Sequence, residues 1–262
     1  MIKSIIPTDE GRIFTFENLK VIVAENRENL GKYAAIKVSN LIKDILKYKD
    51  EIRMIFAAAP SQNEFLHELV NDKSIDWTKI VAFHMDEYIG LSKNTGKLFS
   101  EYLELHLFSK VKFKKVNIIN SYSDNINKEC NRYEALLREK PIDIACMGIG
   151  ENGHIAFNDP PVADFNDNKL VKIVELDNSC RRQQVNDGCF LKLQDVPEKA
   201  ITLTIPALLS SKYLCIVVPG LRKAYAVKNT LLGDISTKCP ASILRRHKNA
   251  YLFLDSDSFS KI

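Results

Sequence analysis

Residues 142–161 read IDIACMGIGENGHIAFNDPP, the pattern of a buried strand followed by a glycine-rich loop. Gly148, Gly150 and Gly153 match G-x-G-x-x-G, the spacing of a dinucleotide-binding loop, and Glu175 follows at about the distance of its ribose-binding acid. A pyrophosphate loop must open directly into a helix, whereas the two prolines that end this stretch prevent one. We therefore predict no nicotinamide cofactor and expect the glycines to permit a sharp turn and close approach of a ligand.

Short β-branched runs alternate with longer amphipathic stretches over the rest of the chain. Runs that predict strands lie at 19–24, 52–57, 79–85, 116–120, 142–147, 170–176, 201–205, 213–218 and 250–254. Helical spacing predicts a helix capped by Asn26 and others near 63–70, 96–108, 127–137, 222–232 and 241–247. This alternation is typical of a mostly parallel sheet covered by helices on both faces. Right-handed crossovers then predict a doubly wound, modified Rossmann-like α/β fold, and we expect one domain over residues 1–262.

Composition and charge indicate an ordinary globular protein. The formal net charge is +4, and the basic residues are scattered without a long block, which favours an anionic small ligand over a nucleic acid. The first twelve residues lack the apolar core of a signal peptide and no segment is long enough to span a membrane, so we expect a cytoplasmic protein. The six cysteines have no paired metal spacing, and Cys146 and Cys215 lie in strand-like runs, where thiols act as small hydrophobes.

Polar residues gather in loops at the predicted strand ends, where ligands bind in sheets of this class. Asp86 and Glu87 are adjacent carboxylates directly after one strand, and the loop at 148–159 holds His154 with Asp159 five residues on. A carboxylate base opposite a histidine suits proton abstraction next to a carbonyl. On the residues alone, a structural histidine and carboxylates that cap a helix or form a turn stay open as alternatives.

At these residues the chain resembles the glucosamine-6-phosphate deaminases, the hexosamine-phosphate isomerase/deaminase family. FHMDEYIGL (83–91) matches F-x-M-D-E-Y-x-G-L, and GIGENGHIAFNDP (148–160) matches G-x-G-x-[DN]-G-H-I-A-F-N-E-P. GLRKA (220–224) resembles G-x-x-K-A, and PASILRRH (240–247) resembles S-x-L-Q-x-H. The order and spacing of these motifs fit over nearly the whole chain.

The resemblance implies a reaction and roles for five residues. Asp86 would be the base that moves a proton between C2 and C1 of the opened sugar, after which ammonia leaves to give fructose 6-phosphate. His154 would assist ring opening, and Asn152 and Asp159 would orient it. Lys223 would meet the phosphate. No metal and no organic cofactor are implied.

The chain departs from the family in its phosphate-binding segments. The family loop T-G-[GS]-T-P is Ala58-Ala59-Pro60-Ser61-Gln62 here, and the family arginine of N-x-R-F-F is replaced by Gly188. Asp159 stands where the family has glutamate. The candidate substrate contacts are therefore Ala58, Ala59, Ser61, Lys223 and, as substitutes for the missing arginine, Arg181 and Arg182.

Three alternatives stay beside glucosamine 6-phosphate deamination. The same chemistry could act on another amino-sugar phosphate such as galactosamine 6-phosphate. A phosphosugar lactonase is another alternative, although lactonases of this fold continue G-H with T-A-S-L-F-P. The third is a sugar-phosphate sensor without catalysis, against which the intact Asp86 and His154 count. We expect a small phosphosugar as the partner, neither nucleic acid nor membrane, and the family includes both monomers and hexamers, so a homo-oligomer stays open.

Overall fold

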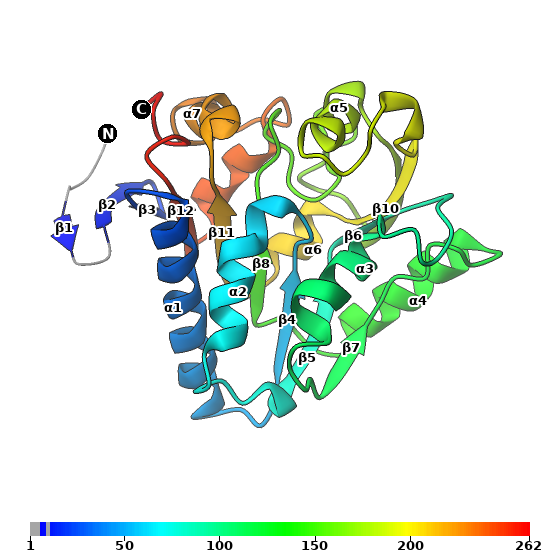
Figure 1. Ribbon diagram of the computed structural model, residues 1–262, viewed down its shortest axis with the longest axis horizontal. Helices are drawn as coiled ribbons and strands as arrows, with labels where there is room; N and C mark the ends of the chain where they lie inside the picture. Colours follow the sequence, from blue (N-terminus) through cyan, green and yellow to red (C-terminus); the bar gives the residue numbers. More distant parts are fainter. Residues whose placement is uncertain (1–5, 9–10) are drawn as a thin grey trace.

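The computed structural model describes residues 6–8 and 11–262, so part of the N-terminal stretch interpreted above lies outside the described residues. Its main element is a nine-stranded sheet (Figure 1). In spatial order the strands are β1 (Ile6–Thr8), β2 (Gly11–Phe16), β3 (Leu19–Val23), β12 (Ala250–Leu254), β11 (Tyr213–Val218), β8 (Ile144–Met147), β4 (Ile52–Phe56), β5 (Ile80–His84) and β7 (Lys115–Asn117). Neighbours from β3 to β7 are parallel, whereas β1 and β2 add an antiparallel edge. The predicted mostly parallel α/β sheet is confirmed.

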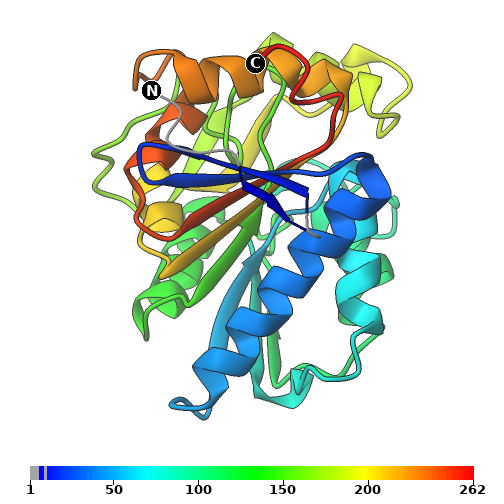
Figure 2. The ribbon, with the colours of Figure 1, turned by 90° about the vertical axis from the view of Figure 1, so that its left-hand side faces the viewer.

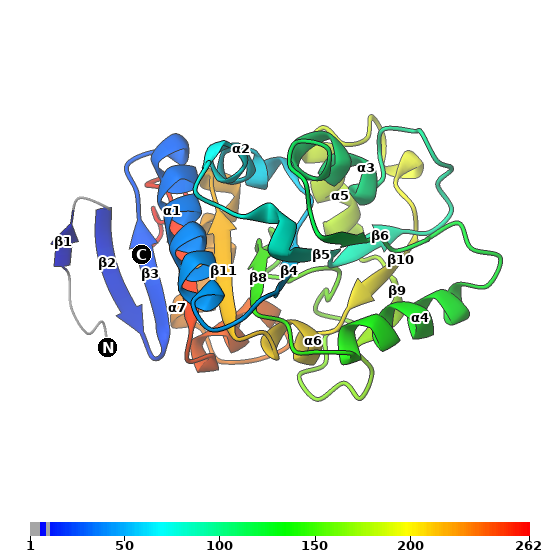
Figure 3. The ribbon, with the colours of Figure 1, turned by 90° about the horizontal axis from the view of Figure 1, so that it is seen from below.

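Helices cover both faces of this sheet. The α-helices of the described residues are α1 (Arg27–Leu46), α2 (Asn63–Asn71), α3 (Phe99–Leu103), α4 (Ile126–Arg138), α5 (Asn178–Asn186), α6 (Ile205–Leu209) and α7 (Ala224–Leu232). Figure 3 shows α1 and α2 on one side of the sheet and α6 and α7 on the other. Among the described residues, none of the helices combines the length and the apolar character needed to cross a bilayer.

The strands bury side chains on both faces, which explains their continuous apolar runs. Along β8, Ile144 and Cys146 pack with the residues of α1, whereas Ala145 and Met147 pack with those of α7. Cys146 also lies opposite Cys215 of β11 in the same core, and both are free thiols. Alternation of side chains along a strand produces this division, so a strand with helices on each side requires apolar residues at every position.

Helix α1 follows the predicted capping and periodicity. The side chain of Asn26 accepts a hydrogen bond from the backbone N–H of Asn29 at 2.9 Å. Leu30, Ala34 and Val38 recur at helical spacing and are buried against the sheet. Figure 2 shows this helix crossing the sheet beside blue β3 and red β12, which pair in parallel.

A second, three-stranded antiparallel sheet corrects part of the sequence interpretation. Its strands are β6 (Asp86–Tyr88), β10 (Lys199–Leu203) and β9 (Val171–Glu175). The segment DEYIG, expected to be only a loop, begins with a strand, and Glu175 lies opposite Lys199 in this small sheet. Apolar alternation predicts a strand but not its partner, because pairing depends on the neighbours that the fold supplies.

The order of strands places a crevice between β4 and β8. From β4 the chain proceeds to β5 and β7 on one side, and from β8 it proceeds to β11 and β12 on the other. Loops leaving the carboxyl ends of these strands diverge at such a switch point and leave space for a ligand.

Candidate active site

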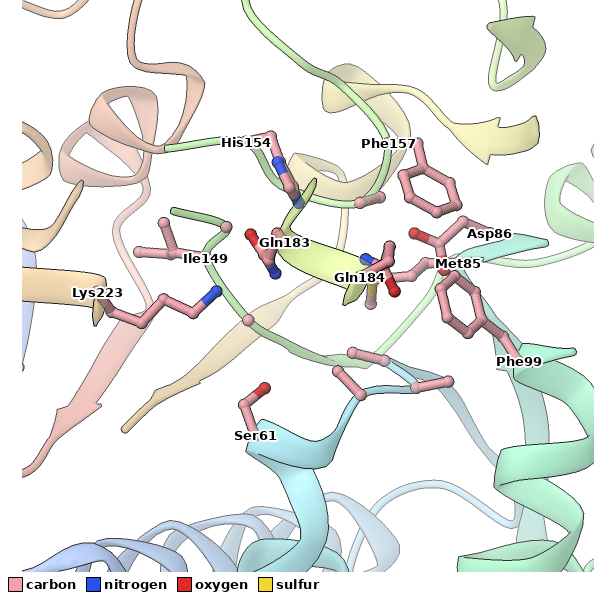
Figure 4. A pocket seen from close by; sticks show the side chains of 16 residues that line it. Ser61, Met85, Asp86, Phe99, Ile149, His154, Phe157, Gln183, Gln184 and Lys223 are labelled. Carbon is pink, nitrogen blue, oxygen red and sulfur yellow. The ribbon is translucent and has the colours of Figure 1, made fainter. Parts of the chain in front are cut away.

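A pocket lies over the carboxyl ends of β11, β8, β4 and β5, and α5 closes it from above (Figure 4). Its walls come from the segments that follow each of these four strands. Of the residues predicted for the site, the pocket wall includes Ala58, Ala59, Ser61, Asp86, His154 and Lys223. Asn152 and Asp159 lie directly behind His154 and contact it.

Asp86 and Glu87 separate into different environments although they are adjacent. Asp86 faces the pocket, and its carboxylate makes no hydrogen bond to any described residue. Burial, with a smaller contribution from the charge of Glu87, holds the pKa of Asp86 well above its usual value. Glu87 points the other way and accepts hydrogen bonds from the backbone N–H groups of Phe99 and Ser100 at 2.9 and 2.8 Å. Strand alternation causes the separation, so Asp86 can react while Glu87 caps α3.

His84 positions Asp86 from below the pocket. Its Nδ1–H donates to the backbone carbonyl of Asp86 at 3.0 Å, and its Nε2 accepts from the N–H of Ile119 at 2.9 Å. Burial lowers the pKa of His84 to about 4. The neutral ring therefore fixes the corner where β5 passes into β6. Sequence reasoning missed this role, because a histidine at the end of an apolar strand gives no signal of its partners.

His154 is oriented by two acceptors. Its Nδ1 lies 2.8 Å from Oδ1 of Asn152 and 2.9 Å from Oδ1 of Asp159. Because both neighbours accept, Nδ1 carries the proton and Nε2 is left without a hydrogen bond to any described residue. Asn152 also donates from Nδ2 to Asp159 at 2.9 Å. Burial raises the pKa of Asp159, but hydrogen bonds from His154 and Asn152 outweigh it and the net pKa is below the usual value.

The glycines of the opening motif make room for this histidine. A Cβ at Gly150 would overlap the His154 ring, and one at Gly153 would lie 2.6 Å from the sulfur of Cys239. Gly153 also has φ +84°, which favours glycine. Residues 148–161 are all described and contain no helix; α5 begins only at Asn178. The prediction that no helix opens at this loop is confirmed.

Lys223 and Ser61 lie on the side of the pocket away from Asp86 (Figure 4). The Lys223 side chain is only 7% exposed, and its amine has no hydrogen-bond partner among the described residues. Burial lowers the pKa of Lys223, partly opposed by the charges of Asp187 and Glu151. A buried, unpaired amine aimed into a cavity is suited to an anion.

The loop that carries Lys223 is fixed by the C-terminal part of the chain. The backbone N–H of Gly220 donates to both carboxylate oxygens of Asp255, at 3.0 and 2.9 Å. An adjoining cavity shares Ser61 and Lys223 with the pocket and is also lined by Arg27 and Arg222. Glu151 and Asp187 line the same cavity and Arg27 is paired with Glu64 at 2.7 Å, so Lys223 is the buried cation on this side that has no hydrogen-bond partner among the described residues.

Helix α5 presents glutamines rather than arginines to the pocket. Arg181 donates to the carbonyls of Leu193 and Val196 at 3.0 and 2.9 Å, and neither it nor Arg182 lines the pocket. Gln183 and Gln184 line it instead. The helical period places residues two positions apart on different faces. Sequence reasoning missed these glutamines because α5 was not predicted, since it carries few apolar residues.

His154, Asp159 and Cys180 form the one group of potential metal ligands among the described residues, with ligand atoms within 4.8 Å of one another. Nδ1 of His154 already donates to Asp159. Burial, followed by the charge of Asp159, raises the pKa of the Cys180 thiol well above its usual value, which disfavours the thiolate that binds metals. The three side chains are better described as a hydrogen-bonded polar cluster behind the pocket.

Comparison with protein families and curated sequences gives consistent matches. The family described as glucosamine-6-phosphate isomerases/6-phosphogluconolactonase matches residues 25–253. A glucosamine-6-phosphate deaminase of Bacillus cereus (strain B4264) is 33% identical over 242 residues, which are 92% of this chain and 88% of the relative. A glucosamine-6-phosphate deaminase of Bacillus cytotoxicus is 34% identical over the same length and shares.

Solved structures show the same fold. A monomeric glucosamine-6-phosphate deaminase has a TM-score of 0.84 and 28% sequence identity, covering 92% of this chain and 99% of that one. The 6-phosphogluconolactonase of Thermotoga maritima has a TM-score of 0.73 and 21% identity, covering 90% and 98%. The second likeness concerns the fold alone.

Proposed function

The chain belongs to the family of glucosamine-6-phosphate isomerases and 6-phosphogluconolactonases, and we propose that it converts glucosamine 6-phosphate to fructose 6-phosphate and ammonia. The proposal rests on one observation, a single pocket whose two sides carry different functional groups. Asp86 lies on one side and the unpaired Lys223 on the other, with His154 between them at the rim (Figure 4). A sugar phosphate has the matching arrangement, with its reacting carbons and its anionic group at opposite ends.

The first step is opening of the sugar ring. Nε2 of His154 takes the proton of the C1 hydroxyl and returns it to the ring oxygen, which produces the free aldehyde. The hydrogen bonds of Nδ1 to Asn152 and Asp159 support this role, because they keep Nε2 free and place an anion beside the transient imidazolium.

Asp86 then moves one proton between adjacent carbons. The ionised carboxylate removes the proton from C2 of the amino aldehyde to form an enolamine, and the resulting carboxylic acid delivers that proton to C1. The product is a ketose imine, and addition of water to C2 expels ammonia. A carboxyl group whose pKa is raised by burial serves both halves of this transfer better than an ordinary one.

The anionic end of the substrate is assigned to Lys223 and Ser61. Ser61 lies in η1 (Pro60–Gln62), directly before α2, and lines the same space as Lys223. Arg222 lines the adjoining cavity, whereas the charge of Arg27 there is balanced by an ion pair with Glu64 at 2.7 Å. Lys223 is thus the main cation proposed to serve in place of the arginine that is absent at position 188.

Hydrolysis of a lactone is a less suitable assignment. In that reaction water attacks a carbonyl group and no proton is removed from carbon, so the buried Asp86 carboxyl would have no role. Its support is the fold likeness to lactonases. The cytoplasmic location and the homo-oligomer stay predictions, to be tested by cell fractionation and light scattering.

The test is ammonia release from a panel of sugars. We expect glucosamine 6-phosphate to be deaminated at the highest kcat/KM, with fructose 6-phosphate as the second product. Galactosamine 6-phosphate, free glucosamine and 6-phosphogluconolactone complete the panel. Faster turnover of the galactose epimer would change the substrate, and hydrolysis of the lactone without ammonia release would refute the deaminase.

A further inference from the structure

Two consecutive glutamines of α5 reach into the pocket, and the proposed chemistry uses neither. Figure 4 shows Gln183 and Gln184 on the helix segment above the pocket floor. Both side chains are buried, and both line the pocket together with Asp86 and His154. Their surroundings differ, and the difference assigns them different roles.

Both polar groups of the Gln183 side chain form hydrogen bonds within the protein. Its Oε1 accepts from the backbone N–H of Glu151 at 2.7 Å, and its Nε2 donates to Asp187 at 3.3 Å. Glu151 belongs to the loop that carries His154, so Gln183 links α5 to that loop. Gln183 is therefore a structural support.

Gln184 makes no side-chain hydrogen bond to any described residue, although it is only 7% exposed. Buried amides are nearly always paired, because an unpaired amide loses its hydration without compensation. The pocket is the space that the side chain faces. A ligand, or water in its absence, must therefore meet this amide.

The position of Gln184 places it at the reacting end of the pocket. In Figure 4 it lies on the side of Asp86 and Phe99, whereas Lys223 lies on the opposite side. A contact from Gln184 thus falls near the carbons that exchange a proton with Asp86, and away from the anionic group.

At that end a protonated amine needs an acceptor other than the base. Among the side chains that line the pocket, Asp86 is the one carboxylate, and an ion pair with the amine would occupy the group that must take the proton from C2. Ser61 lies at the other end, and Oε1 of Gln183 already accepts from Glu151. Nε2 of His154 is assigned to ring opening, so among the side-chain oxygens that line the pocket Oε1 of Gln184 is the acceptor that remains.

We propose that Gln184 is the specificity-determining residue for the amino group at C2 of the substrate, an inference that rests on the proposed function. Its Oε1 accepts a hydrogen bond from the ammonium, which leaves Asp86 free to act as the base. Its Nε2 is available to the neighbouring hydroxyl. The neutral amide selects an amino sugar without adding a second negative charge beside Asp86.

Two unreactive open-chain analogues test this assignment. 2-Amino-2-deoxyglucitol 6-phosphate keeps the amine, and 2-deoxyglucitol 6-phosphate has hydrogen at that carbon. Binding of both is measured by calorimetry with the wild type, Gln184→Met and Gln184→Glu. Gln194→Met is the matched control, since Gln194 is exposed and outside the pocket.

The wild type should bind the amine analogue about 10- to 100-fold more tightly than the deoxy analogue, the range for a hydrogen bond to a charged group. Gln184→Met keeps the side-chain volume but removes the acceptor, so the ratio of the two dissociation constants should fall below about threefold. Gln184→Glu keeps an acceptor oxygen and should retain the ratio. The control should behave as the wild type.

Persistence of the wild-type ratio in Gln184→Met would overturn the assignment, because Asp86 or another group would then hold the amine. Loss of the ratio in Gln184→Glu as well would also overturn it, since an acceptor would remain. Both variants should melt within about 2–4 °C of the wild type, because no native hydrogen bond is removed. Gln184→Ala gives the same comparison if methionine does not pack.

Failure of the proposed function has a different signature. The wild type would then release no ammonia from glucosamine 6-phosphate and would bind neither analogue, and the assignment of Gln184 would fall with it. If the wild type is an active deaminase and only the variants fail to change the ratio, the role of Gln184 alone is refuted.

Discussion

At the scale of single residues, the adjacent carboxylates Asp86 and Glu87 have different environments, because they lie on opposite faces of the short strand β6. Asp86 faces the pocket without a hydrogen bond, and Glu87 accepts three backbone N–H groups, from Tyr88, Phe99 and Ser100. Chemistry and stability are thus separable by substitutions one position apart.

Asp86→Asn should lower kcat by about two to four orders of magnitude, because it keeps the shape but removes the base. Steady-state kinetics on glucosamine 6-phosphate measure the loss. Since Asp86 must be ionised to take a proton and its pKa is raised, wild-type kcat/KM should fall with decreasing pH through a pKa well above the usual 3.8. Turnover near that of the wild type would remove Asp86 from the mechanism.

Glu87→Gln is the matched control for that substitution. It should cost about 1–3 kcal/mol in the free energy of unfolding, because buried N–H groups of α3 lose a charged acceptor. Its kcat should fall far less than that of Asp86→Asn. Urea unfolding and kinetics on both variants separate the two roles, and an equal loss of activity would contradict the separation.

Gly150→Ala tests whether position 150 must be glycine to leave space for the His154 ring. An added Cβ would overlap the His154 ring and displace it from Asp159. We expect kcat to fall by at least about tenfold, since misplacing a catalytic group by about 1 Å is costly. Gly96→Ala is a control for activity, because nothing lies within 4 Å of the added Cβ and the strain of an alanine at φ +71° stays within an exposed turn outside the pocket. Equal activity of Gly150→Ala and the wild type would show that the His154 ring does not need the space that Gly150 leaves.

At the scale of elements, the junction between β5 and β6 turns the chain from the large sheet into the small one. His84 fixes this junction by bonds to Asp86 and Ile119, and the hydroxyl of Tyr133 on α4 accepts from the backbone N–H of His84 at 3.0 Å. Asp86, the proposed base, is therefore held by a strand junction that α4 supports from outside the pocket.

The junction should make stability sensitive to acid. His84 has a folded-state pKa of about 4, below its usual 6.5, so the unfolded chain binds the proton more readily in this range. Stability is present above pH 6.5 and is lost as the pH falls toward 4, by on the order of 3 kcal/mol. Urea unfolding of the wild type and of His84→Gln between pH 7.5 and about 4 measures this loss of stability. The gap in unfolding free energy between the two proteins should narrow with falling pH, and a constant gap would contradict the argument.

At the scale of the whole molecule, the pocket exists because four strands end beside one another. Asp86 follows β5, His154 follows β8, Ser61 follows β4 and Lys223 follows β11, although β11 comes long after the others in the chain. The C-terminal Asp255 in turn holds Gly220 before Lys223. The anion-binding end thus depends on the complete sheet.

Lys223→Ala should lower kcat/KM for glucosamine 6-phosphate by roughly ten- to a hundredfold, the loss of a charge-assisted contact of about 1.5–3 kcal/mol. Residual activity on free glucosamine should not change, because that substrate lacks the anion. Lys228→Ala on the exposed face of α7 is the control for general charge. A parallel loss on both substrates would mean that Lys223 supports the fold.

The class of fold follows from the amino-acid sequence alone, and the same sequence predicts which groups react. Continuous apolar runs between helical patterns require a sheet covered on both faces, and Asp86 and His154 stand in long motifs at strand ends. These features are local, because hydrophobic periodicity and turn-forming residues can be recognised within about ten consecutive residues. The same reasoning excluded a helix after Gly153.

Which side chains surround those groups depends on how distant segments pack in the folded chain. Folding directed Asp86 rather than Glu87 into the pocket, placed Arg181 on carbonyls away from it, and brought Gln184 to the side of the pocket where Asp86 lies. It also paired β6 with β10 instead of leaving a loop. Such choices depend on contacts between segments about a hundred residues apart, and their energies come from packing and burial that no local pattern contains.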